Sequence, residues 1–228
     1  MGWLGLSSNA KSLAFTALGF LRTPTIIYTE EKVSAFEQLW DAALQQNGDR
    51  QLDYHLPYPK YEFLFHLSSR HGYLMHGSPD INIDMFEPRV QTTFYGKRVK
   101  AVFAASDGIW PTFFAILDRR VLSQYRNGCF SVDANLTSRK RYFFSVPKGM
   151  LSEEPWTDGV VYILPRAGFQ RSDNPNEWIC PQSVKPVSKI HISPADFPFL
   201  SRITEYDPGD SMPKFFIRQA LSSRLARD

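Results

Sequence analysis

The sequence predicts an α+β domain in which helices come first and strands follow. Two segments in the first third of the chain, 30–46 and 59–71, place apolar residues at helical spacing. Between residues 129 and 192, short apolar runs alternate with proline and glycine, which is typical of strands separated by turns. This segregation of helices from strands favours the α+β class over a regular alternation of the two.

The first helix is expected to begin after Thr29, whose hydroxyl suits an N-cap. Glu30 and Glu31 follow, and acidic residues are favourable in a first turn. The helix should end at Asn47-Gly48. Its buried face is predicted to consist of Val33, Phe36, Trp40, Ala43 and Leu44.

A second helix is predicted from Pro59, a residue tolerated at a helix start, to Gly72, a common C-terminal stop. Phe63, Leu64 and Leu67 should face the core. A short buried strand then covers 73–76, and a loop with one turn of helix covers 79–95. A further strand is expected over 99–105.

The rest of the chain combines one more helix, several strands and an amphipathic tail. Ser106 or Asp107 can cap the helix, and Pro111 fits its first turn. The tail over 212–225 should close the domain, or else bind a partner. Strands are expected over 129–132, 142–146, 160–164, 177–180 and 187–192.

Composition supports an ordered intracellular protein. The 228 residues are 43% hydrophobic and 14% aromatic, which excludes global disorder. A net charge of +3 allows an anionic substrate without demanding nucleic acid, and the basic run 138–141 is expected on a solvated turn rather than in a nucleic-acid groove. Cys129 and Cys180 are predicted to be buried free thiols, because two cysteines cannot make a disulfide framework.

Neither a membrane span nor a metal site is expected. The apolar stretch 12–21 is far shorter than the roughly 20 residues that a span requires, so it is interpreted as a short packed helix rather than a signal peptide. No Cys/His cluster has zinc spacing. His66 and His71, at the end of the second helix, are expected to be surface or capping residues. The protein is therefore expected to be cytoplasmic.

Two segments about a hundred residues apart carry the chemistry. His76-Gly77-Ser78 stands at the end of the strand that begins at residue 73. Glu177 opens the strand over 177–180, where burying a carboxylate is costly unless the group is used or paired. Phe103 and Phe114 fall between these segments, on a strand and a helix that can share one cleft, although aromatic residues there are more often core.

Taken together, these segments resemble the ADP-ribosyltransferase superfamily, especially its poly- and mono-ADP-ribosyl polymerase-like branch. There, His-Gly-Ser ends one strand, an aromatic-Ala strand follows, and Asn-Glu-aromatic-Ile comes near the last strands. The resemblance covers residues 61–200. It implies a split β-sheet core with N-terminal helices, a helical extension over 1–58, a catalytic domain over 59–202 and a C-terminal tail over 203–228.

The resemblance also implies NAD+ as substrate, cleaved at the bond between nicotinamide and ribose, with ADP-ribose passed to a protein or nucleic-acid acceptor or to water. His76 would bind the adenosine ribose, with Ser78 as a further hydroxyl partner. The backbone of Gly77 would hold the nicotinamide amide. The two phenylalanines would line and stack on the nicotinamide, and Glu177 would be the catalytic carboxylate that stabilises an oxocarbenium-like transition state.

The chain departs from the family pattern at three places. Phe103 replaces a tyrosine. Pro111 stands near the position of an amide-binding serine, with Thr112 as the nearest hydroxyl. Pro175 stands two residues before the glutamate, where the toxin-like branch has Glu or Gln.

Two alternatives remain, and the losses of the tyrosine hydroxyl and of the amide-binding serine favour the first. One is a non-catalytic module that binds a nucleotide or a protein on the same fold. The other is an RNA-processing relative that removes a phosphate with NAD+, for which Arg89, Arg98 or Arg166 would have to lie near His76.

Overall fold

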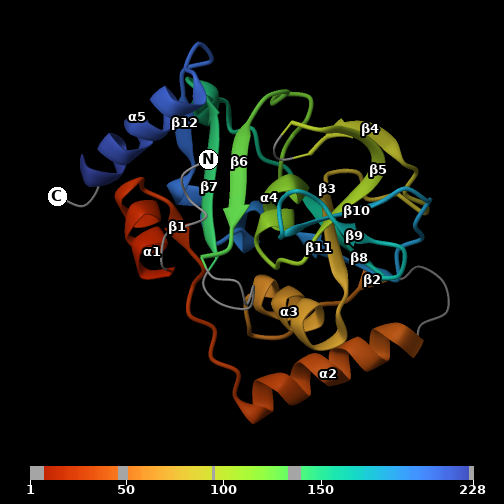
Figure 1. Ribbon diagram of the computed structural model, residues 1–228. Coiled ribbons are helices and arrows are strands. Elements are labelled where there is room, and N and C mark those ends of the chain that lie inside the picture. The colour runs from red at the N-terminus through yellow and green to blue at the C-terminus, as the bar shows by residue number, and fades with distance from the viewer. Residues whose placement is uncertain (1–7, 46–50, 94–95, 133–139, 226–228) are drawn as a thin grey trace. The chain divides into compact units, whose positions relative to one another are not determined.

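A computed structural model describes residues 8–45, 51–93, 96–132 and 140–225 of the chain (Figure 1). The chain divides into two compact units, each built from separate segments. The larger unit comprises Thr25–Arg119 and Trp156–Pro198, and the smaller unit comprises Met1–Pro24, Arg120–Pro155 and Phe199–Asp228. Both combine helices with a sheet, so the α+β class is confirmed. The units do not coincide with the expected boundaries at 58/59 and 202/203.

An eight-stranded sheet forms the centre of the larger unit. Its strands run in the order β2-β11-β8-β3-β5-β10-β9, with β4 paired to β5. Their bounds are β2 Gln51–Leu52, β3 Leu74–Ser78, β4 Arg89–Thr92, β5 Arg98–Ala105, β8 Gly159–Leu164, β9 Gln170–Arg171, β10 Glu177–Cys180 and β11 Ser188–Ile192. Strand β4 corrects the expectation of a loop with a helical turn over 79–95, because that segment lacks the alternation that marks a strand in sequence.

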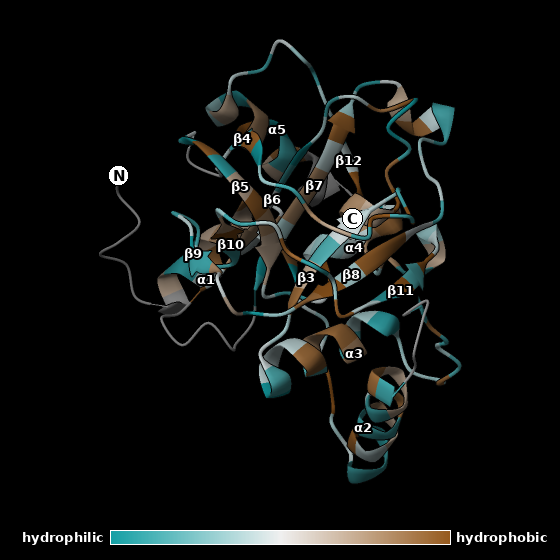
Figure 2. Ribbon diagram, turned by 90° about the vertical axis from the view of Figure 1, so that its right-hand side faces the viewer, coloured by the Kyte–Doolittle hydropathy of each residue, from teal (hydrophilic) through white to brown (hydrophobic). Residues whose placement is uncertain are grey.

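Strand β8 is central and buried at every position, and its valine, isoleucine and leucine residues make most of it brown in Figure 2. It pairs antiparallel with β3 on one side and with β11 on the other. A continuous apolar run such as Val160–Leu164 is what burial on both faces requires. One core cluster gathers side chains from β3, β5, β8 and β10 and from the segments around Phe86 and Val184: Leu74, Phe86, Val102, Ala104, Val160, Tyr162, Leu164, Trp178, Cys180 and Val184.

Helices α2 (Glu30–Gln45) and α3 (Lys60–His66) pack against each other below the sheet in Figure 1. Thr29 accepts the Lys32 N–H at 3.2 Å, so the expected cap is confirmed. The rings of Phe36 and Phe63 meet edge to face at 5.4 Å. The predicted face of α2 is wrong at Leu44, which is 49% exposed, while Leu39 is buried instead.

The second helix continues as a π-helical turn, η1 (Leu67–His71), and stops at Gly72. Gly72 has φ 75°, a left-handed conformation that glycine adopts without a Cβ penalty. Helix α4 (Trp110–Ala115) follows β5, and Asp107 accepts the N–H groups of Ile109 and Trp110 at its start. The short helix η3 (Pro194–Asp196) ends the unit.

The smaller unit contains a four-stranded sheet built around β7 (Arg141–Pro147). This strand pairs with β1 (Leu21–Arg22), β6 (Arg126–Phe130) and β12 (Thr204–Tyr206). Helices α1 (Ser8–Ala17) and α5 (Met212–Leu225) and the 3₁₀ turns η2 (Met150–Glu153) and η4 (Leu200–Arg202) complete it. Aromatic rings fill the core, and Phe215 of α5 lies 5.5 Å from Phe143, so α5 closes this unit as expected.

Two other expectations have clear outcomes. Cys129 and Cys180 are buried thiols that are not joined in a disulfide, as predicted. Lys140 and Arg141 are only 6% exposed, so they do not lie on a solvated turn; Arg141 begins β7 and donates to Ser12. Residues 138 and 139 lie outside the described part of the chain. Among the described helices, none is both long and apolar enough to cross a bilayer.

Candidate functional site

The three segments that carry the expected site lie side by side in the large sheet. His76 is on β3, Phe103 on the adjacent β5 and Glu177 on β10, which is the next strand along. The three strands keep their chain order in the sheet, although β8, which comes between β5 and β10 in the chain, pairs with the opposite side of β3. The fold therefore brings together residues that are about a hundred positions apart.

Strands β3 and β5 separate at the position of His76. The two strands pair at one position only, Met75 with Ala105. From His76 to Ser78, β8 is the only described strand that pairs with β3. The His76 imidazole bridges the separation, since its Nδ1 lies 2.7 Å from the carbonyl oxygen of Phe103. A carbonyl can only accept, so Nδ1 carries the hydrogen and Nε2 of the neutral ring is left as an acceptor.

The surroundings of His76 keep the ring neutral. Burial lowers its pKa from 6.5, and the positive charges of Arg119 and Arg89 lower it further, whereas the bond to Phe103 acts in the opposite direction. A phenyl ring, that of Phe86, packs 4.6 Å from the imidazole. The site therefore offers a neutral imidazole acceptor with two guanidinium groups nearby.

The side chains of His76 and Glu177 project from opposite faces of the sheet. Met75 pairs with Ala105, and Ala105 pairs with Glu177, so these three residues form one row across β3, β5 and β10. Paired residues share a face and successive residues alternate, so His76 lies on the other face. Phe103 shares the face of Glu177, because it pairs with Ile179 two positions further along β10.

Gly77 allows helix α4 to approach the sheet on the Glu177 face. A Cβ at this position would lie 1.7 Å from the carbonyl oxygen of Pro111, a distance that no side chain can tolerate. Phe114 belongs to the same helix and is half-buried, with the Phe113 ring 5.8 Å away. The structure thus brings Phe103, Glu177 and the helix that carries Phe114 to one face.

Ser78 lies on the His76 face, where its hydroxyl organises the next loop. Its Oγ accepts the N–H of Asp80 at 3.1 Å. Tyr162 holds the same loop, since its hydroxyl donates to the Asp80 carbonyl at 2.8 Å and accepts the Ile83 N–H at 2.9 Å. Ser78 therefore has a structural role, and its hydroxyl hydrogen can still be donated to a ligand.

Glu177 is half-buried and oriented by the loop before it. Ser172 donates its hydroxyl to Glu177 Oε1 at 2.6 Å, and the main chains of the two residues are also joined, Ser172 N–H to the Glu177 carbonyl, at 2.9 Å. The Glu177 N–H donates to the carbonyl of Asn174. These bonds fix the carboxylate at the start of β10.

Sequence reasoning missed two of these groups, Ser172 and Arg119. Ser172 lies in the polar turn before Glu177, and only the folded turn shows that its hydroxyl reaches the carboxylate. Arg119 follows α4 without any local pattern, whereas Arg89 was among the arginines named in the sequence analysis. Arg166 lies elsewhere, with its guanidinium 4.5 Å from the centre of the Trp178 ring.

Comparison with known proteins identifies no relative: no protein-family model, curated protein or solved structure matches the chain.

Proposed function

We propose that the chain is an NAD+-dependent enzyme of the ADP-ribosyltransferase type, with the split β-sheet core of that fold. It would break the bond between nicotinamide and ribose and transfer ADP-ribose to a protein, a nucleic acid or water. One observation carries the proposal. His76, Phe103 and Glu177 stand on three adjacent strands, and the sheet separates beside His76. The proposed NAD+ site is this separation between β3 and β5.

The nicotinamide riboside half would lie on the Glu177 face. Phe103 and Phe114 are both half-buried and supply aromatic surface for the ring. Because α4 occupies the Cα side of Gly77, that residue would contact the carboxamide through its main chain at the strand edge. Glu177, held by Ser172, would stabilise the positive charge that develops on the ribose.

The adenosine half would lie on the His76 face. Nε2 of the neutral imidazole would accept a hydrogen bond from a ribose hydroxyl. Arg89 and Arg119 are close enough to lower the His76 pKa, and guanidinium groups are well suited to a diphosphate. To reach both His76 and Glu177, the dinucleotide would have to pass between β3 and β5, so the bond between His76 and the Phe103 carbonyl would have to open on binding.

In the proposed reaction the C1′–N bond breaks and both its electrons leave with nicotinamide. The ribosyl cation is captured by an acceptor oxygen or nitrogen, which loses a proton. When the acceptor is water, the product is free ADP-ribose. A carboxylate that acts by charge needs to be ionised but requires little tuning of its pKa.

A second candidate is a nucleotide-binding module without turnover. Two observations favour it: His76 and Glu177 project from opposite faces, and the Glu177 carboxylate already accepts the Ser172 hydroxyl. A third candidate, removal of a 2′-phosphate from RNA with NAD+, is favoured by the influence of Arg89 on His76.

The test is release of nicotinamide from NAD+ by the purified chain, beside Glu177→Gln and with NAD+ protection against heat as a binding readout. Release that falls at least about 100-fold in the variant supports the enzyme. Protection without release supports the binding module. Release only when a 2′-phosphorylated RNA is added supports the third candidate. Absence of both release and protection with NAD+ alone and with the RNA present rejects all three.

A further inference from the structure

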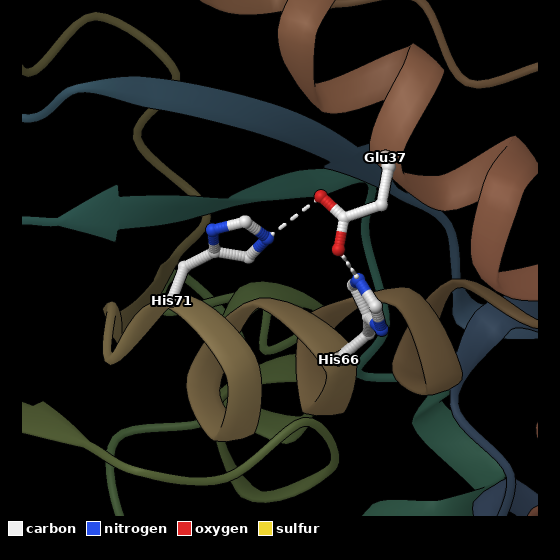
Figure 3. A group of neighbouring side chains, drawn as sticks. All are labelled: Glu37, His66 and His71. Atoms are coloured by element: carbon white, nitrogen blue, oxygen red, sulfur yellow. Dashed lines mark hydrogen bonds and ion pairs between the residues drawn. The ribbon is translucent and has the colours of Figure 1, made fainter.

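Three potential metal ligands converge beneath the sheet of the larger unit. Glu37 lies on α2, His66 ends α3 and His71 ends the π-helical turn η1 (Figure 3). One carboxylate oxygen of Glu37 lies 2.8 Å from His66 Nε2, and the other lies 2.9 Å from His71 Nε2. One ligand atom from each residue falls within 4.8 Å of the others. We call these residues the Glu37 cluster.

The π-helical turn is what brings the two histidines together. In an α-helix, at about 100° per residue, residues five apart point about 140° away from each other. In a π-helical turn the hydrogen bonds run from i to i+5, so residues five apart lie one above the other. His66 and His71 are five apart and flank such a turn, with their ring centres 5.8 Å apart. Turns of this kind occur frequently at functional sites.

The cluster also has the right kinds of ligand. Neutral imidazole and carboxylate are the forms in which histidine and glutamate bind a metal ion. Nε2 of each ring already faces a carboxylate oxygen of Glu37, and His66 is held in place because it is only 1% exposed.

We propose that Glu37, His66 and His71 bind one divalent transition-metal ion of the Zn²⁺ class. The ligands would be Nε2 of each imidazole and one carboxylate oxygen, with water in the fourth position. Tetrahedral coordination separates neighbouring ligand atoms by about 3.4 Å. The ligating oxygen of Glu37 therefore has to move about half an ångström away from the imidazole that it contacts now, at 2.8 or 2.9 Å, and the other imidazole has to turn toward the same oxygen. Each ring would bind the ion through an Nε2 without hydrogen, with the hydrogen on Nδ1.

Access and mobility suit this change. The side chains of Glu37 and His71 are 36% and 31% exposed, so an ion can enter from solvent and two of the three ligands can adjust. His66 is the fixed member, packed against the Phe36 ring at 5.4 Å. The bound ion would tie α2 to the corner where η1 turns into β3, the strand that carries His76.

This site could not be predicted from the sequence pattern. It contains no Cys/His motif of zinc spacing, and the third ligand comes from a helix about thirty residues earlier. His66 was expected at the surface or in a cap, which is wrong because it is buried; His71 is exposed as expected. His66 and His71 are five residues apart, and this separation places two side chains on one face of a helix only where the helix contains a π-helical turn.

The test titrates the EDTA-treated full chain with Co²⁺ and then displaces it with Zn²⁺. The expected result is one ion per chain, with the visible absorption bands of four-coordinate Co²⁺. His71→Ala and Glu37→Gln should each weaken Zn²⁺ binding at least about 100-fold. The matched control is His191→Ala, which removes another exposed imidazole paired with a carboxylate, Asp158 at 3.2 Å, and should leave binding unchanged.

Circular dichroism of each variant separates loss of the site from loss of the fold, and His71→Ala is the decisive variant because its side chain is partly exposed. If the wild type binds no stoichiometric ion at micromolar concentration, or if folded His71→Ala binds as the wild type does, the proposal is wrong. The Glu37 cluster is then only a hydrogen-bonded clamp between helices.

Discussion

The imidazole of His76 donates its Nδ1–H to the main-chain carbonyl of Phe103 across the place where β3 and β5 separate. A side-chain hydrogen bond thus joins the two strands where no main-chain pairing does. The bond selects one tautomer, and burial keeps the ring uncharged. This pairing links a residue of the proposed adenosine site to the strand of the proposed nicotinamide site.

The stability of the protein should carry a pH dependence that comes from His76. Its folded pKa lies below the value of 6.5 that the unfolded chain has, so the unfolded state binds the proton more readily. Well above pH 6.5, His76 is neutral in both states and does not change the free energy of unfolding. As the pH drops below 6.5, protonation of the unfolded chain lowers the free energy of unfolding progressively. Urea unfolding at pH 7.5 and pH 5.5 should show a smaller decrease for His76→Gln than for the wild type. Equal decreases would mean that the pKa of His76 is not lowered in the folded protein.

Gly77→Ala should destabilise the larger unit by about 3 kcal/mol or more, at the upper end of the range for overpacked interiors. The added Cβ would meet the Pro111 carbonyl at 1.7 Å, and backbone cannot move aside as a side chain can. Gly209→Ala is the control, because the nearest atom to its Cβ is a side-chain oxygen at 3.4 Å, and a change within about 0.5 kcal/mol is expected there. Denaturant unfolding measures both; a neutral Gly77→Ala would show that α4 does not press on β3.

Asp107→Ala should cost about 2–3 kcal/mol of unfolding free energy. Its fully buried carboxylate accepts two N–H groups at the start of α4, at 2.8 Å from Ile109 and 2.6 Å from Trp110. Truncation leaves both donors without that acceptor, and such losses cost about 1–3 kcal/mol each before relaxation. Asp107→Asn retains a side-chain oxygen and should lose only about 1 kcal/mol. If thermal or urea unfolding shows the same loss of unfolding free energy for both variants, Asp107 stabilises the protein through its charge rather than through the hydrogen bonds that it accepts.

Ser172→Ala should lower nicotinamide release about tenfold while leaving Glu177 in place. The hydroxyl orients the carboxylate at 2.6 Å but does not itself take part in the proposed bond cleavage. A loss in kcat with little change in KM is expected, since positioning of a catalytic group acts on the transition state. Ser172→Thr keeps a hydroxyl and should recover part of the rate. An unchanged kcat in Ser172→Ala would mean that Glu177 is positioned by other contacts.

Much of the fold could be predicted because the sequence patterns that mark its strands and helix ends involve neighbouring residues. The strand over 177–180 matches β10, and the caps at Thr29 and Asp107 are present, since each depends on neighbouring residues. Strand β4 was missed because its four residues are all exposed and show no alternation. The burial of Arg141 could not be predicted either, because it depends on pairing with β1 and on contact with Ser12.

The sequence allowed us to predict which residues form the candidate site, but not how their side chains are arranged. The sequence places His76 and Glu177 at strand ends, yet only the register between β3, β5 and β10 shows that they face opposite sides. The roles of Ser172 and Arg119 likewise depend on tertiary contacts. Glu37 and His71 meet only because α2 packs beside a π-helical turn, an arrangement that hydrophobic periodicity does not reveal.

The interleaving of the two units in the chain has a consequence for biosynthesis. In the larger sheet, β11 stands between β2 and β8, so the sheet lacks one of its inner strands until residues 188–192 have left the ribosome. The smaller unit begins with α1 but receives β12 and α5 only after every segment of the larger unit has been made. Because pairings between such distant segments form slowly, apolar strands such as β8 stay exposed in the nascent chain until their partner strands have been synthesised.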